Sequence, residues 1–309
     1  MHHHGSGCVF AASLAAALAL GFCAADAAVI AKMSATHALR YARAAGRGAG
    51  AVRPHGGFGL RPELLPSLHP SPDSPTKAFP ALSDPRLGLY AVVDSADWVE
   101  RVLAAGVRTV QLRIKEGARA HLSREVSRSV LAAHRARAQL FINDHWELAI
   151  ENGAYGVHLG QEDRRSADMD ALRSAGLRVG LSTHSYWEVC RAHAWAPSYI
   201  ACGPIHATTT KDMPWWPQGP GNLAYWCHVL RAPVVAIAGM DVERSVEAVQ
   251  CGAAGVAVLR GIVQASDPTR MVHQLQSAID AAYSSTPVPA PRLPRSTYPG
   301  PVAPIFLDR

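Results

Sequence analysis

Polar side chains recur at short intervals in the middle of the chain, where most neighbouring residues are apolar. In "QLRIK", Gln111, Arg113 and Lys115 are spaced two residues apart, so in a strand all three would point the same way. Asn143 and Asp144 end another apolar run, "LFIND". Two positive charges on one buried strand face are costly unless an anion meets them. The spacing therefore predicts an anion-binding site around Arg113 and Lys115.

Two carboxylates follow neighbouring apolar runs. Asp144 ends the run named above, and Asp163 ends "GVHLGQED", which also contains His158. Paired acids can perform general acid–base chemistry, or they can hold Mg²⁺, which takes one or two carboxylates and leaves positions for water and phosphate. A base needs a raised pKa, whereas neighbouring cations lower it. The basic neighbours favour Mg²⁺ on Asp144 and Asp163. His158 and His184, which ends "GLSTH", are interpreted as hydrogen-bonded wall residues.

Hydroxyl groups and glycines follow the later apolar runs, in "GLSTH", "GPIHATTTK", "AIAG" and "VLRG". Backbone N–H groups in such glycine-bearing turns commonly bind phosphate. The sequence therefore predicts two anion pockets. The first contains Arg113, Lys115, Asn143, Ser182 and Lys211, and the second contains Thr208, Thr210, Gly239 and the backbone amides of Leu259 and Arg260.

The elements that would position these groups alternate regularly. Between about residues 87 and 284, eight apolar, β-branched runs are each followed by an amphipathic stretch. The runs are continuously apolar, which is typical of parallel strands covered on both faces. This α/β pattern predicts a (β/α)8 TIM barrel, whose active site lies at the C-terminal ends of the strands. A doubly wound open sheet is the rival, but the first turn contains no G-x-G-x-x-G motif.

The segments on either side have a different composition. Residues 1–85 contain the apolar stretch "CVFAASLAAALALGFCAADAA", interrupted by Gly21 and Asp26, and then a stretch rich in Gly and Pro. A translated leader and an irregular helical extension both remain open for this stretch. We expect an irregular or disordered N-terminal extension and linker at 1–85, the barrel at 86–284 and a Pro-rich tail at 285–309.

Composition limits the classes of partner. The chain has 309 residues, 49% of them hydrophobic, and a net charge of +6. The basic residues form no dense run and no basic–aromatic face, so we expect no nucleic acid as a partner. Gly21 and Asp26 interrupt the N-terminal apolar stretch, so we expect no membrane as a partner either. None of the six cysteines forms a C-x-x-C pair or has His at zinc spacing. Free thiols in a reducing compartment are therefore expected.

Seven motifs in this order resemble the thiamine-phosphate synthase family: "QLRIK", "IND", "GVHLGQED", "GLSTH", "GPIHATTTK", "AIAG" and "GVAVLRGI". The resemblance spans about Gly88 to Ile279. It implies a Mg²⁺-dependent transferase that joins 4-amino-2-methyl-5-pyrimidinylmethyl diphosphate to 4-methyl-5-(2-phosphoethyl)thiazole, which gives thiamine phosphate and pyrophosphate. The implied partners are these two phosphorylated small molecules. The implied location is the cytoplasm, where the substrates are held, and a homo-oligomer is left open.

The resemblance also implies roles for individual residues. Arg113, Lys115 and Lys211 would be catalytic, because they would stabilise negative charge on the departing pyrophosphate. Asp144 and Asp163 would bind Mg²⁺. The residues that would bind the two substrates are Gln111, Arg113, Lys115, Asn143, His158, Ser182, Thr208, Thr209, Thr210, Lys211, Gly239, Leu259 and Arg260.

The chain departs from the family pattern in three places. Ala238 precedes Gly239 where the family has paired glycines, Arg260 stands where a small residue or Ser is common, and Ile114 replaces a polar residue. A small residue is kept before Gly239, and Arg260 would act through its backbone amide. The Pro and Trp residues at 214–217 are expected to stiffen a lid that excludes water.

Two alternatives stay open at this point. A thiazole tautomerase-like isomerase would bind one phosphate and would need no metal pair. A non-catalytic barrel could bind a phosphorylated ligand without transforming it. The presence of Asp144, Asp163 and the complete "QLRIK" motif favours the synthase.

Overall fold

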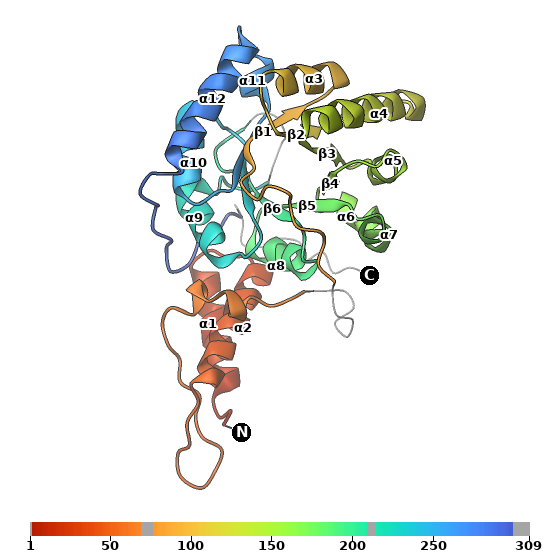
Figure 1. Ribbon diagram of the computed structural model, residues 1–309. Helices are drawn as coiled ribbons and strands as arrows, with labels where there is room; N and C mark the ends of the chain where they lie inside the picture. The colour runs from red at the N-terminus through yellow and green to blue at the C-terminus, as the bar shows by residue number, and fades with distance from the viewer. Residues whose placement is uncertain (1, 69–76, 209–213, 299–309) are drawn as a thin grey trace.

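The chain forms a closed barrel of eight parallel strands, paired in sequence order with the first strand hydrogen-bonded to the last (Figure 1). The computed structural model describes residues 2–68, 77–208 and 214–298. The strands are β1 (Gly88–Val93), β2 (Thr109–Leu112), β3 (Gln139–Asn143), β4 (Gly156–Leu159), β5 (Arg178–Thr183), β6 (Tyr199–Cys202), β7 (Val234–Ile237) and β8 (Gly255–Val258). The predicted (β/α)8 fold is confirmed.

Helices follow the strands and cover the outside of the barrel (Figure 1). Side chains of Ser95, Asp241 and Asp267 accept backbone N–H groups at the starts of three of them, as N-caps do. The helices are α3 (Ala96–Ala104), α4 (Arg119–Ala136), α5 (Trp146–Glu151), α6 (Asp163–Ser166), α7 (Met169–Ser174), α8 (Tyr186–Ala194), α9 (Gly219–Val229), α10 (Val242–Gln250), α11 (Arg260–Val263) and α12 (Pro268–Ala282).

Both faces of each strand are buried, which explains the continuous apolar runs in the sequence. In β1, Leu89 and Ala91 belong to the apolar layer between strands and helices, whereas Tyr90 and Val92 belong to the barrel interior. Residues that alternate along a strand therefore serve two different cores.

Aromatic rings fill the barrel interior. The rings of Tyr90, Phe141 and Tyr199 lie with centroids 5.0–5.9 Å apart, and the Tyr90 and Tyr199 hydroxyls are 2.8 Å from each other. A Cβ atom at Gly180 would lie 2.0 Å from Tyr199 Cζ, so only glycine leaves room for this ring. The interior is thus a packed core.

The N-terminal extension differs from the expected irregular segment. It contains α1 (Ser6–Ala19) and α2 (Ala24–Arg40), followed by the short 3-10 helices η1 (Phe58–Leu60) and η2 (Pro62–Leu64). Ile30 and Met33 are buried in α2, because apolar residues recur at helical spacing along this segment. The two helices project from the barrel beside α8 (Figure 1). None of the described helices has the length and apolar character needed to cross a membrane.

A buried carboxylate of α2 bonds to the barrel, in addition to the apolar contacts between them. Asp26 is 1% exposed, and it accepts the backbone N–H of Trp187, near the start of α8, at 2.7 Å. Burial is the largest cause that raises the pKa of Asp26, to about 6 from 3.8. One of the contacts that attach the extension is therefore made by a titratable group.

We expect this group to make folding more stable in acid than at neutral pH. Because the pKa of Asp26 is raised in the folded state, the carboxyl of the unfolded chain loses its proton first as the pH rises. The stability that the protonated Asp26 contributes is therefore lost as the pH rises through about 6. Relative to Asp26→Asn, which cannot titrate, the wild type should lose about 2 kcal/mol between about pH 4.5 and 7.5. Urea denaturation of both proteins across this range measures the difference, and parallel pH profiles would contradict it.

Candidate functional site

A cavity of about 1100 Å³ opens at the C-terminal ends of the strands. All eight strands, or the residues directly after them, contribute to its wall. The wall includes most of the described residues that the sequence singled out: Gln111, Arg113, Asn143, Asp144, His158, Asp163, Ser182, Thr208, Gly239, Leu259 and Arg260. Thr209, Thr210 and Lys211 lie outside the described residues.

Lys115 is the described candidate that the structure does not bring to the cavity. The last ladder contact after β2 is the Arg113 N–H, which donates to the Val93 carbonyl at 2.7 Å, and the strand itself ends at Leu112. Residues beyond Arg113 no longer follow the alternation of a strand. The Lys115 side chain is exposed and does not line the cavity, whereas Gln111 and Arg113 do.

Asp144 and Asp163 lie close together at the ends of β3 and β4. Burial and the neighbouring Asp163 carboxylate raise the pKa of Asp144 to about 6, and Arg113 opposes this shift. The sequence predicted that basic neighbours would keep this pKa low, but burial and carboxylate repulsion outweigh one guanidinium. A cation placed between the carboxylates would relieve this repulsion.

The backbone sets the direction of both carboxylates. Asp144 has φ 61°, in the left-handed region that Asp tolerates better than most residues, and the N-cap of α5 is the next residue, His145. Asn143 donates a hydrogen bond from its side-chain amide to the Asp144 carboxylate. A Cβ atom at Gly160 would lie 2.6 Å from Asp163 Oδ2, so the glycine makes room for this carboxylate.

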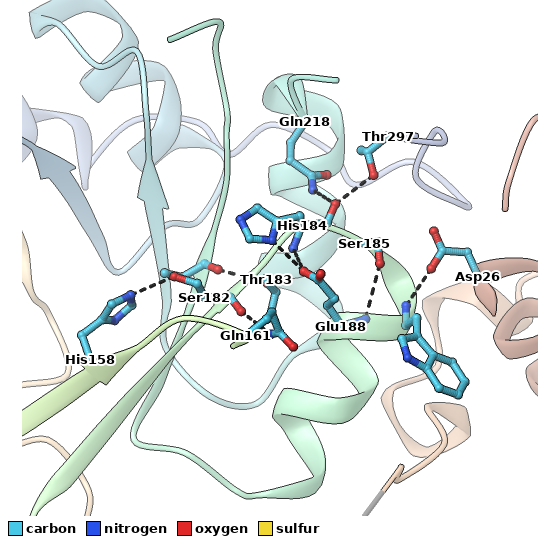
Figure 2. A network of polar contacts seen from close by, with 12 residues as sticks. Asp26, His158, Gln161, Ser182, Thr183, His184, Ser185, Glu188, Gln218 and Thr297 are labelled. Atoms are coloured by element: carbon cyan, nitrogen blue, oxygen red, sulfur yellow. Dashed lines mark hydrogen bonds and ion pairs between the residues drawn. The ribbon is translucent and has the colours of Figure 1, made fainter. Parts of the chain in front are cut away.

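His158 is buried between the barrel core and the cavity. Its Nδ1 lies 2.8 Å from the Tyr199 hydroxyl and its Nε2 lies 2.8 Å from Ser182 Oγ, so both ring nitrogens have partners in the protein. Burial, with a smaller contribution from Arg113, lowers the pKa of His158 to about 4, which keeps the ring neutral at neutral pH. The ring therefore orients Ser182, whose carbonyl also accepts a 2.5 Å hydrogen bond from Gln161 (Figure 2).

The opposite wall of the cavity consists of tight turns. Gly239 has φ 71°, and a Cβ atom there would lie 2.7 Å from His206 Cβ and 2.9 Å from the Ala207 carbonyl oxygen. Thr208, Leu259 and Arg260 lie on the same side, after β6 and β8. Closely packed backbone of this kind is suited to binding phosphate through N–H groups.

Ala238 occupies a conformation that L residues adopt with strain, because its φ is 81°. Ala238→Gly should therefore stabilise the fold by about 0.5–1 kcal/mol, the left-handed penalty of Ala less the added chain entropy of Gly. Urea denaturation of the two proteins measures the difference. A lower stability of the glycine variant would contradict the proposed backbone strain at Ala238.

Several cavity residues were missed by sequence reasoning, because they come from segments expected to be irregular or from a turn without a motif. Cys23 and Ala25 reach the wall from the N-terminal extension, and Tyr298 reaches it from the C-terminal tail. His184 also lines the cavity, and its Nδ1 lies 2.7 Å from Glu188 Oε2 (Figure 2). His184 was interpreted from the sequence as a hydrogen-bonded wall residue, but nothing in the sequence paired it with Glu188.

The donor set determines which metal could bind. Within the described residues, no group of three or more His, Cys, Asp or Glu side chains is arranged to hold an ion. Two carboxylates facing an open cavity match the way Mg²⁺ is bound, through one or two carboxylates, water and substrate phosphate. The residues present therefore fit Mg²⁺ better than zinc, which prefers a closed set of N and S ligands.

Comparisons with known proteins agree with this geometry. Residues 89–262 match the family described as thiamine monophosphate synthase. The chain is 51% identical over 185 residues to the thiamine-phosphate synthase of Cronobacter sakazakii, which covers 59% of this chain and 87% of that protein. It is 49% identical over 203 residues to the synthase of Neisseria meningitidis serogroup B, 65% of this chain and 98% of the relative.

A solved structure supports the fold alone. Thiamine phosphate pyrophosphorylase from Pyrococcus furiosus superposes with a TM-score of 0.58 at 23% identity, over 64% of this chain and 97% of that one. The family match covers more than half of the chain, and the two relatives align over 87% and 98% of their length. The chain therefore belongs to the thiamine monophosphate synthase family.

Proposed function

We propose that the chain condenses 4-amino-2-methyl-5-pyrimidinylmethyl diphosphate with 4-methyl-5-(2-phosphoethyl)thiazole to give thiamine phosphate and pyrophosphate. The observation that carries the proposal is one cavity with the Asp144–Asp163 pair and Arg113 on one wall and the Gly239 turn on another. Membership of the synthase family supports the same reaction. Two phosphorylated reactants could then lie side by side.

Asp144 and Asp163 would hold Mg²⁺, because they are the paired carboxylates of the cavity and repel each other when both are charged. Bound there, the ion would neutralise charge on the diphosphate leaving group. Arg113 lies close enough to Asp144 to oppose its raised pKa, so its guanidinium is placed to bind the same diphosphate. Gln111, Asn143 and His158-oriented Ser182 would complete this pocket.

The reaction exchanges one bond for another. The bond between the pyrimidinyl methylene carbon and the diphosphate oxygen breaks, and the oxygen keeps the electron pair. The thiazole nitrogen then donates its lone pair to that carbon and forms the new C–N bond. No proton needs to move, so placement and stabilisation of charge can supply the catalysis. This agrees with a neutral His158 whose ring nitrogens are both occupied by protein partners.

The second pocket would bind the thiazole phosphate. Thr208, the Gly239 turn and the backbone at Leu259 and Arg260 lie together on the wall of the cavity. Trp215 and Pro214 also line the cavity and would keep water from the electron-poor carbon. Four assigned roles stay predictions, those of Lys115, Thr209, Thr210 and Lys211. A cytoplasmic location is proposed because the substrates would be held there.

The direct experiment incubates the protein with both substrates, with Mg²⁺ and with excess chelator, and measures thiamine phosphate. Formation of the product only with Mg²⁺ supports the proposal. Binding of the thiazole phosphate without product would contradict it and would favour the isomerase-like or ligand-binding alternative. A change in the thiazole alone, without pyrophosphate release, would identify the isomerase.

A further inference from the structure

The turn between β5 and α8 lines the cavity with five consecutive or nearly consecutive residues: Thr183, His184, Ser185, Trp187 and Glu188. Glu188 Oε2 accepts the His184 backbone N–H at 2.8 Å and lies 2.7 Å from His184 Nδ1. The position of the His184 ring at the cavity therefore depends on the backbone of this turn (Figure 2).

The N-terminal extension fixes one side of the turn. Asp26 Oδ1 accepts the Trp187 N–H at 2.7 Å (Figure 2). The Ser185 side chain lies close enough to Asp26 for a side-chain hydrogen bond that opposes the raised pKa of this carboxyl. A carboxylate at this point also interacts favourably with the N-terminal end of the α8 dipole. Asp26 is buried yet does not line the cavity, so it acts on the turn from behind.

The C-terminal tail fixes the other side of the turn. The His184 carbonyl accepts two hydrogen bonds, from Thr297 Oγ1 at 2.8 Å and from Gln218 Nε2 at 2.7 Å (Figure 2). Thr297 is 3% exposed and does not line the cavity. Two consecutive stretches of the turn backbone are thus bound by residues from opposite ends of the chain.

The tail is itself held in place next to the cavity. Asn222 bonds both backbone groups of Arg295, at 2.8 and 3.0 Å, and the Thr297 carbonyl accepts the Trp216 N–H at 2.7 Å. Tyr298 follows, and its ring lies against Trp215 with centroids 5.3 Å apart. The Trp215 ring lies parallel to the His184 ring, at 5.7 Å, so the tail and the turn meet through one row of rings.

We propose that Asp26 and Thr297 are positioning residues for the substrate cavity and act through the turn at His184–Trp187. The inference rests on the proposed function, since it concerns the same cavity. Both residues lie outside the matched family segment, residues 89–262, so the barrel shared with the family does not supply these contacts. Displacing a substrate-contacting element by about 1 Å can reduce the rate about 100-fold, so two hydrogen bonds at this turn can matter to turnover.

The test uses the full-length chain and two pairs of variants. Thr297→Val removes the hydroxyl with little change in shape, whereas Thr297→Ser keeps a hydroxyl. Asp26→Ala removes the carboxylate acceptor, whereas Asp26→Asn keeps a side-chain oxygen that can accept. We expect Thr297→Val and Asp26→Ala each to lower kcat/KM about 10-fold, and the conservative partners to retain activity. Hydrogen exchange of the peptide that contains the turn should rise in the two deleterious variants and stay low in their partners.

Matched controls remove a hydrogen bond from the same regions without touching the turn. Ser13→Ala breaks the 2.9 Å bond to Ser34 in the helical extension, and Tyr283→Phe breaks the 3.0 Å bond to the Ala254 carbonyl just before the tail. Both should keep kcat/KM within about twofold. Thr297→Val kinetics and turn exchange equal to those of Tyr283→Phe would overturn the proposal, even if Asp26→Ala failed to fold. If the wild type makes no thiamine phosphate, that result contradicts the proposed function. The hydrogen exchange of the turn peptide in the variants would still test whether Asp26 and Thr297 position the turn.

Discussion

Asp144→Asn should reduce turnover at least about 100-fold while the barrel stays folded. Asparagine has nearly the same shape and tolerates the left-handed backbone at φ 61°, which strains alanine. The change removes one of two carboxylates that repel each other, so the folded state should be at least as stable as the wild type. Steady-state rates at saturating Mg²⁺ and thermal unfolding measure the two effects.

Two companion variants sharpen this result. Asp163→Asn should give a comparable loss, because both carboxylates are proposed to hold the same ion. Asp170→Asn removes a carboxylate that is 92% exposed and pairs only at the surface with Arg173, so its rate should match the wild type. A variant of Asp144 with normal turnover would contradict the metal assignment, whatever the outcome at Asp163.

The barrel and most of its mouth could be predicted from sequence because they depend on local patterns. Continuous apolar runs identified the strands, and the fold then placed residues such as Asp144 and Ser182 at one end of the barrel. The prediction that Lys115 points the same way as Gln111 and Arg113 was wrong. Side chains alternate only while the backbone is paired with neighbouring strands, and β2 ends at Leu112. The raised pKa of Asp144 also escaped prediction, since it depends on burial and on its distance from Asp163.

The contribution of the two ends of the chain could not be predicted, because it depends on tertiary contacts. Asp26 interrupts an apolar stretch, which from sequence alone argued only against a membrane span. In the structure it accepts the Trp187 N–H near the start of α8. Likewise, Thr297 lies in a Pro-rich segment without periodicity, and its role follows from the single carbonyl of His184 that it reaches.

Gly239→Ala should lower kcat/KM for the thiazole phosphate about 100-fold and leave KM for the pyrimidine diphosphate nearly unchanged. The new Cβ would lie 2.7 Å from His206 Cβ and 2.9 Å from the Ala207 carbonyl oxygen, so the turn after β7 would have to move. The backbone N–H groups proposed to bind the phosphate would move with it. Initial rates with each substrate varied in turn measure the two constants.

Gly176→Ala separates this displacement from simple backbone strain. Gly176 has the same φ of 71°, but a Cβ atom there would meet no atom within 4 Å, and the residue does not line the cavity. Both variants carry the penalty of a left-handed alanine, about 1–2 kcal/mol, and both should unfold more easily. Only Gly239→Ala should change the thiazole constant, because only there does the side chain push the wall of the cavity. If Gly239→Ala changed the constants of both substrates equally, the thiazole phosphate would bind elsewhere. An equal loss of kcat/KM in Gly176→Ala would lead to the same conclusion.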